Sequence, residues 1–354
     1  MEEIKKRQGV RIVAALLLIL ICAFSLALPV CALDGAASEE YVYVGGMPFG
    51  VRYVTDGIMV VGYCDVRAEN GVKNPAREAG IHAGDCILSV GGVAPRSAKE
   101  LGEIIRQNGC KPLTVTVRRE GGEMTFTLTP VVCQSDGTAR TGLWVRDTGA
   151  GLGTVTFVMQ DKHTFAGLGH GICDGESALL VPILRGSVMD VTIAGITRGA
   201  PGAPGELKGH FAAGKVGILQ GNTVCGVYGS YLEAPRDLGQ LLPVGKAAEL
   251  HDGDATIRTT LDGDGVGEYH VKISDIHVGA TGNKCFTVTV TDSNLLAKTG
   301  GIVQGMSGSP IVQDGKLVGA VTHVLIGDPT TGYGIFIENM LNASESARNE
   351  LPAA

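Results

Sequence analysis

Two serines lie in a short run of glycines late in the chain, and one of them is placed to act as a nucleophile. The segment GMSGSP, residues 305–310, is followed by two apolar runs, IVQ and KLVGAVTH, that a turn separates. A serine that attacks a carbonyl needs an exposed hydroxyl and backbone N–H groups free to bind the oxyanion. Gly305 and Gly308 allow that backbone shape because they lack Cβ. We predict Ser307 as the nucleophile and Ser309 as structural, with a plain glycine-serine turn as the alternative.

A serine nucleophile needs a base, and His170 is the leading candidate among eight histidines. It lies in FAGLGHGICDG, where glycines flank a turn after a strand-like run. A single histidine is more often an ordinary surface or core residue. His323, at the end of the hairpin after Ser307, is the competing base, and His163 is a weaker one.

The carboxylate that would orient the base is sought near the nucleophile. Asp292 lies in VTVTDSNLLAKTGG, fifteen residues before Ser307. The alternative role for Asp292 is an N-cap for a short helix over SNLLAK. Asp174 and Asp190 remain alternative carboxylates.

The elements that must position these residues are expected to be short strands. From residue 142 onward the chain has ten or more apolar runs separated by glycines, which is typical of a barrel or a pair of barrels. A polar stretch, CQSDGTART at 133–141, is interpreted as a linker. The formal charge of −7 comes without a basic stripe, so nucleic acid is excluded as a partner.

The nucleophile segment resembles that of chymotrypsin-like serine peptidases, in which Gly-x-Ser-Gly-Gly-Pro precedes a hairpin. The resemblance implies a double β-barrel domain over residues 142–345, and it matches Gly305 and Ser307 to the two amides of the oxyanion hole. Met306 and Ser309 both depart from the usual residues, and Ser309 stands where the family has a glycine. The order of His170 before Ser307 agrees with these peptidases.

The region 39–132 resembles a PDZ domain. The similarity rests on NPAREAGIHAGDCILSVGG, on the helical segment SAKELGEIIRQNG after it, and on the closing pair LTVTVRREGGEMTFTLTP. The family adds a peptide as an extra strand and holds its carboxylate with the amides of a glycine-containing loop. The alternative for that loop here is a simple tight turn. The loop that matches by position comprises Gly45, Gly46, Met47, Pro48, Phe49 and Gly50.

The first 35 residues are predicted to be a signal peptide or a membrane anchor. Lys5, Lys6, Arg7 and Arg11 precede an unbroken apolar run at 12–28. Such a run is at the lower limit for crossing a bilayer, and its basic flank predicts export of the rest of the chain. Nine scattered cysteines without CxxC spacing indicate neither a zinc site nor a disulfide framework, so no metal or cofactor is expected.

Taken together, the N-terminal segment, the PDZ-like region, LGHGICD and TDSNLLAKTGGIVQGMSGSPIVQDGKLVGAVTHV resemble the SpoIVB (stage IV sporulation protein B) peptidases of endospore-forming bacteria. This similarity implies a His170, Asp292, Ser307 triad. It implies release into the space between forespore and mother cell, self-cleavage near the N-terminus, and cleavage of a membrane-bound regulator of an intramembrane protease, which activates late mother-cell transcription. The PDZ ligand would be another peptide or the enzyme's own N-terminal region. The alternatives are a general exported quality-control protease and an inactive PDZ scaffold.

Overall fold

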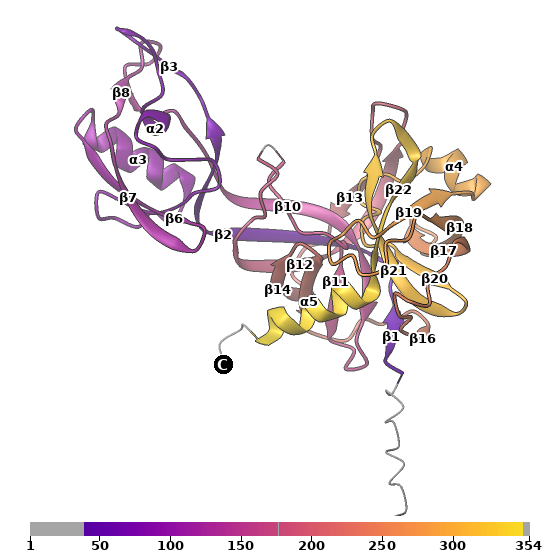
Figure 1. The fold of residues 1–354 in the computed structure, drawn as a ribbon. Helices are drawn as coiled ribbons and strands as arrows, with labels where there is room; N and C mark the ends of the chain where they lie inside the picture. The colour runs from indigo at the N-terminus through magenta and orange to yellow at the C-terminus, as the bar shows by residue number, and fades with distance from the viewer. Residues whose placement is uncertain (1–38, 176, 350–354) are drawn as a thin grey trace, which may run out of the picture. The chain divides into compact units, whose positions relative to one another are not determined.

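The computed structural model describes residues 39–175 and 177–349, which are mainly β (Figure 1). The chain divides into two compact units, Met1–Glu40 and Tyr41–Ala354, and the features below belong to the second. The predicted signal or anchor segment at 1–35 lies outside the described residues. None of the helices within the described ranges is long and apolar enough to cross a membrane.

The last part of the chain forms a closed barrel of six strands. Its residue pattern explains the fold, because in the segment FTVTV the phenylalanine and valines point into the core while the threonines are only partly buried. A short helix precedes the nucleophile segment, and a longer helix follows the last strand. The elements are β17 (Gly253–Thr260), β18 (Val266–Ser274), β19 (Phe286–Val290), α4 (Ser293–Thr299), β20 (Pro310–Gln313), β21 (Lys316–Leu325), β22 (Asp328–Phe336) and α5 (Ile337–Asn349).

Another closed ring of six strands lies earlier in the chain. We call this earlier ring the first barrel, and the ring formed by β17–β22 the second barrel. Each strand of the ring pairs antiparallel with two neighbours, and the order runs β2, β10, β11, β15, β14, β12 and back to β2. Three further strands, β1, β13 and β16, attach at its sides. The bounds are β1 (Tyr41–Val44), β2 (Pro48–Tyr63), β10 (Leu143–Val158), β11 (Thr164–Gly167), β12 (Ile183–Thr197), β13 (Glu206–Phe211), β14 (Gly217–Thr223), β15 (Gly226–Tyr231) and β16 (Leu241–Pro243).

The PDZ-like region is inserted between two strands of this first barrel. Figure 1 shows β2 and β10 as long strands side by side, and their register runs from Pro48 opposite Thr154 to Tyr63 opposite Leu143. Between them lie the remaining elements, whose apolar residues form a core of their own. These are β3 (Val66–Ala68), β4 (Gly71–Lys73), α2 (Pro75–Glu78), β5 (Cys86–Val90), α3 (Ala98–Asn108), β6 (Leu113–Arg119), β7 (Gly122–Leu128), β8 (Val131–Val132) and β9 (Ala139–Arg140).

This insertion changes the predicted domain organisation. The chain forms β1 and the first half of β2 with the barrel before it enters the PDZ-like region, because β2 pairs with β12 up to Thr55 and with β5 from Ile58. The predicted boundary at residue 39 therefore differs from the structure. The predicted linker at 133–141 is instead a turn followed by the strand β9, and β9 pairs with β8. Local alternation shows that a segment is a strand, but long-range pairing decides which sheet it joins.

Candidate active site and peptide groove

The nucleophile segment is a tight turn whose backbone is tied to the following hairpin. Gly308 donates its N–H to Val321 O at 2.7 Å, and Ser309 donates its N–H to Met306 O at 2.9 Å. Gly308 has φ +93°, and a Cβ there would lie 2.1 Å from Thr154 O. Only glycine fits that position. The buried hydroxyl of Ser309 donates to Met306 O at 2.6 Å, which agrees with the structural role expected for it.

The first barrel holds the turn through buried threonines of β10. Thr154 donates its N–H to Ser307 O at 2.9 Å and its hydroxyl to Gly305 O at 2.8 Å. Thr156 donates its hydroxyl to Gly308 O at 2.7 Å. Both threonines are almost fully buried. The turn on the second barrel is therefore shaped by a strand of the first barrel.

Ser307 itself is partly buried, and its hydroxyl donates to Thr322 O at 2.8 Å. The N–H groups of Met306, Gly308 and Ser309 are used by backbone carbonyls. Among the residues that the structure describes, no hydrogen bond uses the N–H of Gly305 or Ser307. The two amides predicted for an oxyanion hole are therefore available to a ligand.

His170 lies on the loop that follows β11, and this loop packs against the nucleophile turn. A Cβ on Gly308 would approach Leu168 N to 2.4 Å, and one on Gly169 would approach Thr322 Cγ2 to 3.0 Å. Nδ1 of His170 lies 2.9 Å from Gly171 O. Because a carbonyl only accepts, this bond places the ring proton on Nδ1 and leaves Nε2 as a base. Burial lowers the pKa of His170, and the bond to Gly171 opposes that shift.

A second histidine completes the cluster. The rings of His170 and His323 have centroids 4.8 Å apart and planes at 37°. Nδ1 of His323 is buried and has no hydrogen-bond partner among the described residues. Burial, then the charges of His170 and Lys284, lower the pKa of His323 to about 4. His323 is therefore neutral at neutral pH, although it lies beside the candidate base.

Asp292 is not brought to His170. Its Oδ1 accepts the N–H groups of Asn294 and Leu295, both at 2.9 Å, and its Oδ2 accepts the N–H of His270 at 3.4 Å. Asp292 is thus the N-cap of α4, which is the alternative that the sequence left open. Backbone hydrogen bonds lower the pKa of its carboxyl, although burial, the largest single influence, acts to raise it.

The other predicted alternatives also lie elsewhere. Asp174 is buried and pairs with Arg146 at 3.4 Å, whereas Asp190 is exposed on β12. His163 precedes β11, so it lies at the opposite end of that strand from His170, and its Nδ1 is 3.0 Å from Tyr231 O. No carboxylate among the described residues hydrogen-bonds to the His170 ring. The structure therefore brings together the predicted turn of Ser307 and the predicted loop of His170, and among the described residues it brings no carboxylate to hydrogen-bond with that histidine.

The predicted PDZ loop at Gly45–Gly50 lies in the first barrel. Gly45 donates its N–H to Thr156 O and Gly46 to Val155 O, both at 2.9 Å, and Pro48, Phe49 and Gly50 pair with Thr154, Gly153 and Leu152. The ring of Phe49 packs in the barrel core, with its centroid 5.7 Å from that of Phe165. These residues support β10 beside the nucleophile turn, so the prediction that they form the peptide loop is wrong. Strand pairing rather than glycine content decided their place.

A groove lies instead between α3 and the beginning of β10, with a volume of about 870 Å³. Residues 143–146 of β10 pair with β2, and no described strand pairs with their other edge. Gly142, at φ +75°, precedes this free edge. The signal in the sequence was TGLWV at 141–145, a glycine turn before apolar residues, which the sequence analysis assigned to the following domain.

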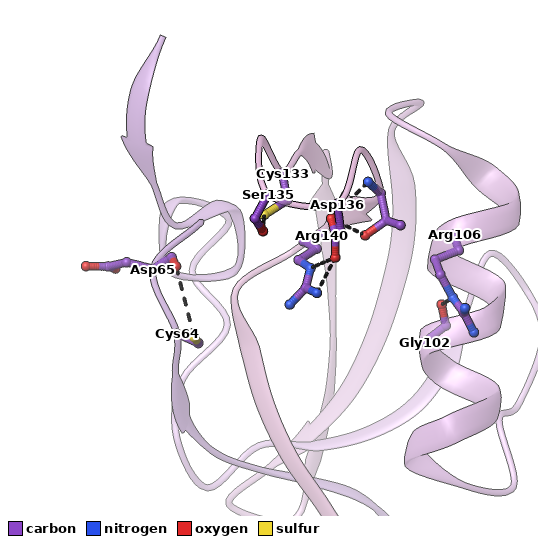
Figure 2. A network of polar contacts seen from close by, with 9 residues as sticks. Cys64, Asp65, Gly102, Arg106, Cys133, Ser135, Asp136 and Arg140 are labelled. Carbon is purple, nitrogen blue, oxygen red and sulfur yellow. Dashed lines mark hydrogen bonds and ion pairs between the residues drawn. The ribbon is translucent and has the colours of Figure 1, made fainter. Parts of the chain in front are cut away.

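The groove carries unpaired positive charge. Figure 2 shows Arg140 bonded to Asp136 on the turn between β8 and β9, while Nε of Arg106 donates to Gly102 O at 3.2 Å within α3. Arg67, Lys99 and Arg106 line the groove together with Asp65, and none of the four forms an ion pair among the described residues, so the unpaired cations outnumber the unpaired carboxylate. Such a groove favours an anionic ligand.

Comparisons with solved structures give partial likenesses. The PDZ domain of an SdrC-like protein from Listeria monocytogenes is 20% identical with a TM-score of 0.21, covering 25% of this chain and 87% of that one. A serine endoprotease from Yersinia pestis is 16% identical with a TM-score of 0.33 (56% and 58%). Rv3671c from M. tuberculosis H37Rv, an inactive Ser343Ala mutant, is 13% identical with a TM-score of 0.32 (58% and 85%). A search of curated proteins found no match.

Family models give the assignment. The PDZ domain model matches residues 71–119, which lie in the inserted region. The model described as SpoIVB peptidase S55 matches residues 137–341, more than half of the chain, and includes His170, Asp292, Ser307 and His323. The chain therefore belongs to the SpoIVB peptidase S55 family and is a serine endopeptidase with a PDZ domain.

Proposed function

We propose that Ser307 attacks the peptide carbonyl and that Nε2 of His170 takes its proton. The amides of Gly305 and Ser307 stabilise the oxyanion, His170 then gives the proton to the leaving amine, and water releases the acyl-enzyme. The observation that carries this proposal is the tight turn with two uncommitted N–H groups beside a histidine whose Nδ1 is held by Gly171. The Ser307 hydroxyl must leave Thr322 O when substrate binds.

The family membership supports a signalling role for this activity. We propose that the enzyme is exported, cleaves itself near its N-terminus, and cuts a membrane-bound regulator of an intramembrane protease in the space between forespore and mother cell. Late mother-cell transcription then follows. The predicted export segment at 1–35 would bring the enzyme to that compartment.

The PDZ domain is proposed to bind a peptide at the groove beside α3. The free edge of β10 at 143–146 offers backbone groups for an added strand, and the N–H of Gly142, which no hydrogen bond uses among the described residues, is offered to a carboxylate. The unpaired Arg67, Lys99 and Arg106 favour the carboxylate and acidic side chains. The ligand is another protein's peptide or the enzyme's own N-terminal region.

The test of the catalytic proposal compares purified wild type with Ser307→Ala and Ser309→Ala. Mass spectrometry of the N-terminus is expected to show processed wild type and unprocessed Ser307→Ala, with a rate loss of about 10⁴-fold or more. Ser309→Ala should lose stability but retain processing. A Ser307→Ala protein that processes itself fully would refute the assignment.

Two other functions are separated by simple assays. A general quality-control protease would degrade denatured casein broadly, whereas a signalling protease should cut it at few sites. An inactive scaffold would not react with a serine-directed fluorophosphonate, whereas the proposed enzyme should be labelled at Ser307. The uncommitted amides of Gly305 and Ser307 favour the active enzyme.

A further inference from the structure

The proposed base lacks the partner that serine peptidases usually give it. When His170 accepts the Ser307 proton, its ring becomes positively charged inside a buried site, and an orienting carboxylate normally stabilises that charge. Here Nδ1 of His170 contacts the neutral carbonyl of Gly171. Asp292 is occupied at the start of α4 by backbone N–H groups. The Gly171 carbonyl favours the charged ring, but a buried charge is costly unless it is well compensated, so a further neighbour that stabilises it would assist the reaction.

His323 is a polar side chain that the structure places beside the His170 ring. It follows Thr322 on β21, whose carbonyl holds the Ser307 hydroxyl, and its own ring lies 4.8 Å from that of His170. Nδ1 of His323 is buried and unpartnered among the described residues. A buried polar atom without a partner is destabilising, and such an atom at a site often indicates a functional role. The charged groups that act on His323 are His170 and Lys284, the latter beside the ring of Tyr333.

We propose that His323 is a positioning residue for His170: its neutral ring packs against the base and holds it in place, and its ring face and buried nitrogen stabilise the imidazolium formed during acyl transfer. His323 takes up no proton, because the proton passes from Ser307 to His170 and then to the leaving amine. The inference rests on the roles proposed above for His170 and Ser307. It deepens them by assigning the stabilising part of a carboxylate to a second histidine.

The test measures the rate of fluorophosphonate labelling of Ser307 against pH for wild type, His323→Phe and His323→Gln. His323→Phe keeps a flat ring but has no nitrogen, so we expect the labelling rate to fall by about 10²-fold, the lower end of the ~10²–10⁴ that general acid–base catalysis supplies. In His323→Phe the acid limb of the labelling rate plotted against pH should move to lower pH, because the charged form of His170 loses stabilisation and its pKa falls. His323→Gln offers an oxygen acceptor and should recover part of the rate.

The controls separate this inference from the catalytic proposal. His163→Phe changes an exposed histidine at the other end of β11 and should leave rate and pH profile unchanged. If wild type is not labelled at Ser307, the catalytic proposal fails. If wild type is labelled and His323→Phe matches it in rate and acid limb, the positioning role alone is refuted. Should His323→Phe fail to fold, His323→Ala takes its place, and a wild-type rate with a wild-type acid limb in that variant refutes the positioning role.

Discussion

The two barrels have the same number of strands but are built differently. The second is closed by strands that follow one another between Gly253 and Phe336, with one short helix between them. The first has a PDZ domain inserted between β2 and β10, and its ring closes only after that insertion. The second barrel supplies Ser307, whereas the first supplies His170 and the two threonines that hold the nucleophile turn. The candidate site therefore draws its residues from both barrels.

This comparison gives β10 two roles. At its beginning, Leu143 and Val145 line the groove beside α3. At its end, Thr154 and Thr156 hydrogen-bond to the nucleophile turn. One strand thus takes part in both candidate sites, and the contribution of the first barrel can be tested at single residues.

The largest effect is expected from removing the base that the first barrel contributes. His170→Ala should reduce fluorophosphonate labelling of Ser307 by about 10⁴-fold, because the nucleophile loses its proton acceptor. His163→Ala is the matched control, since that histidine is exposed on the same barrel. Labelling of His170→Ala at the wild-type rate would show that Ser307 on the second barrel reacts without a base from the first barrel.

The next effect tests whether the first barrel shapes the turn. Thr156→Val keeps the side-chain shape but leaves the buried Gly308 carbonyl without its donor, which should cost about 1–3 kcal/mol of unfolding free energy. Urea denaturation measures the loss, and labelling of Ser307 should slow as the turn loosens. Thr148→Val, on an exposed residue of the same strand, should change neither. Equal behaviour of the two variants would show that the barrels do not depend on this bond.

A smaller effect concerns pH, because His323 is half-buried beside His170 and its Nδ1 is fully buried. Burial lowers its folded pKa to about 4, whereas the unfolded chain takes up a proton near pH 6.5. The unfolded state therefore binds more protons between these values, so this group favours folding above pH ~6.5 and loses that contribution as the pH falls toward 4. Denaturation between pH 7.5 and 4.5 should show a weaker pH dependence for His323→Phe. An unchanged dependence would contradict the burial.

The smallest effect is expected at Asp292. Asn caps a helix about as well as Asp, so Asp292→Asn should retain nearly wild-type stability and activity. Asp292→Ala should lose about 0.5–2 kcal/mol of unfolding free energy and keep its chemistry. A triad carboxylate would instead cost about 10⁴-fold in rate in Asp292→Asn, and that result would restore Asp292 to the catalytic group.

Sequence reasoning succeeded where local chemistry was sufficient. The glycine turn around Ser307 and the glycine-flanked loop of His170 were readable from neighbouring residues, whereas the cap of α4 was only the alternative to the catalytic role predicted for Asp292. It failed at Gly45–Gly50, because a glycine-containing loop before an apolar strand suits a PDZ loop and a barrel strand equally well. The same ambiguity hid the free edge after Gly142, which was assigned to the next domain.

The sequence by itself determined the class of the protein: many short strands, a PDZ-like region and a serine in a glycine turn, since these depend on residue type and short spacing. Only the tertiary structure decided that the PDZ domain interrupts the first barrel, that Asp292 caps a helix, and that the ring of His323 lies beside that of His170. The physical reason is that these features depend on strand pairing and ring packing between segments far apart in the chain, which local patterns do not encode.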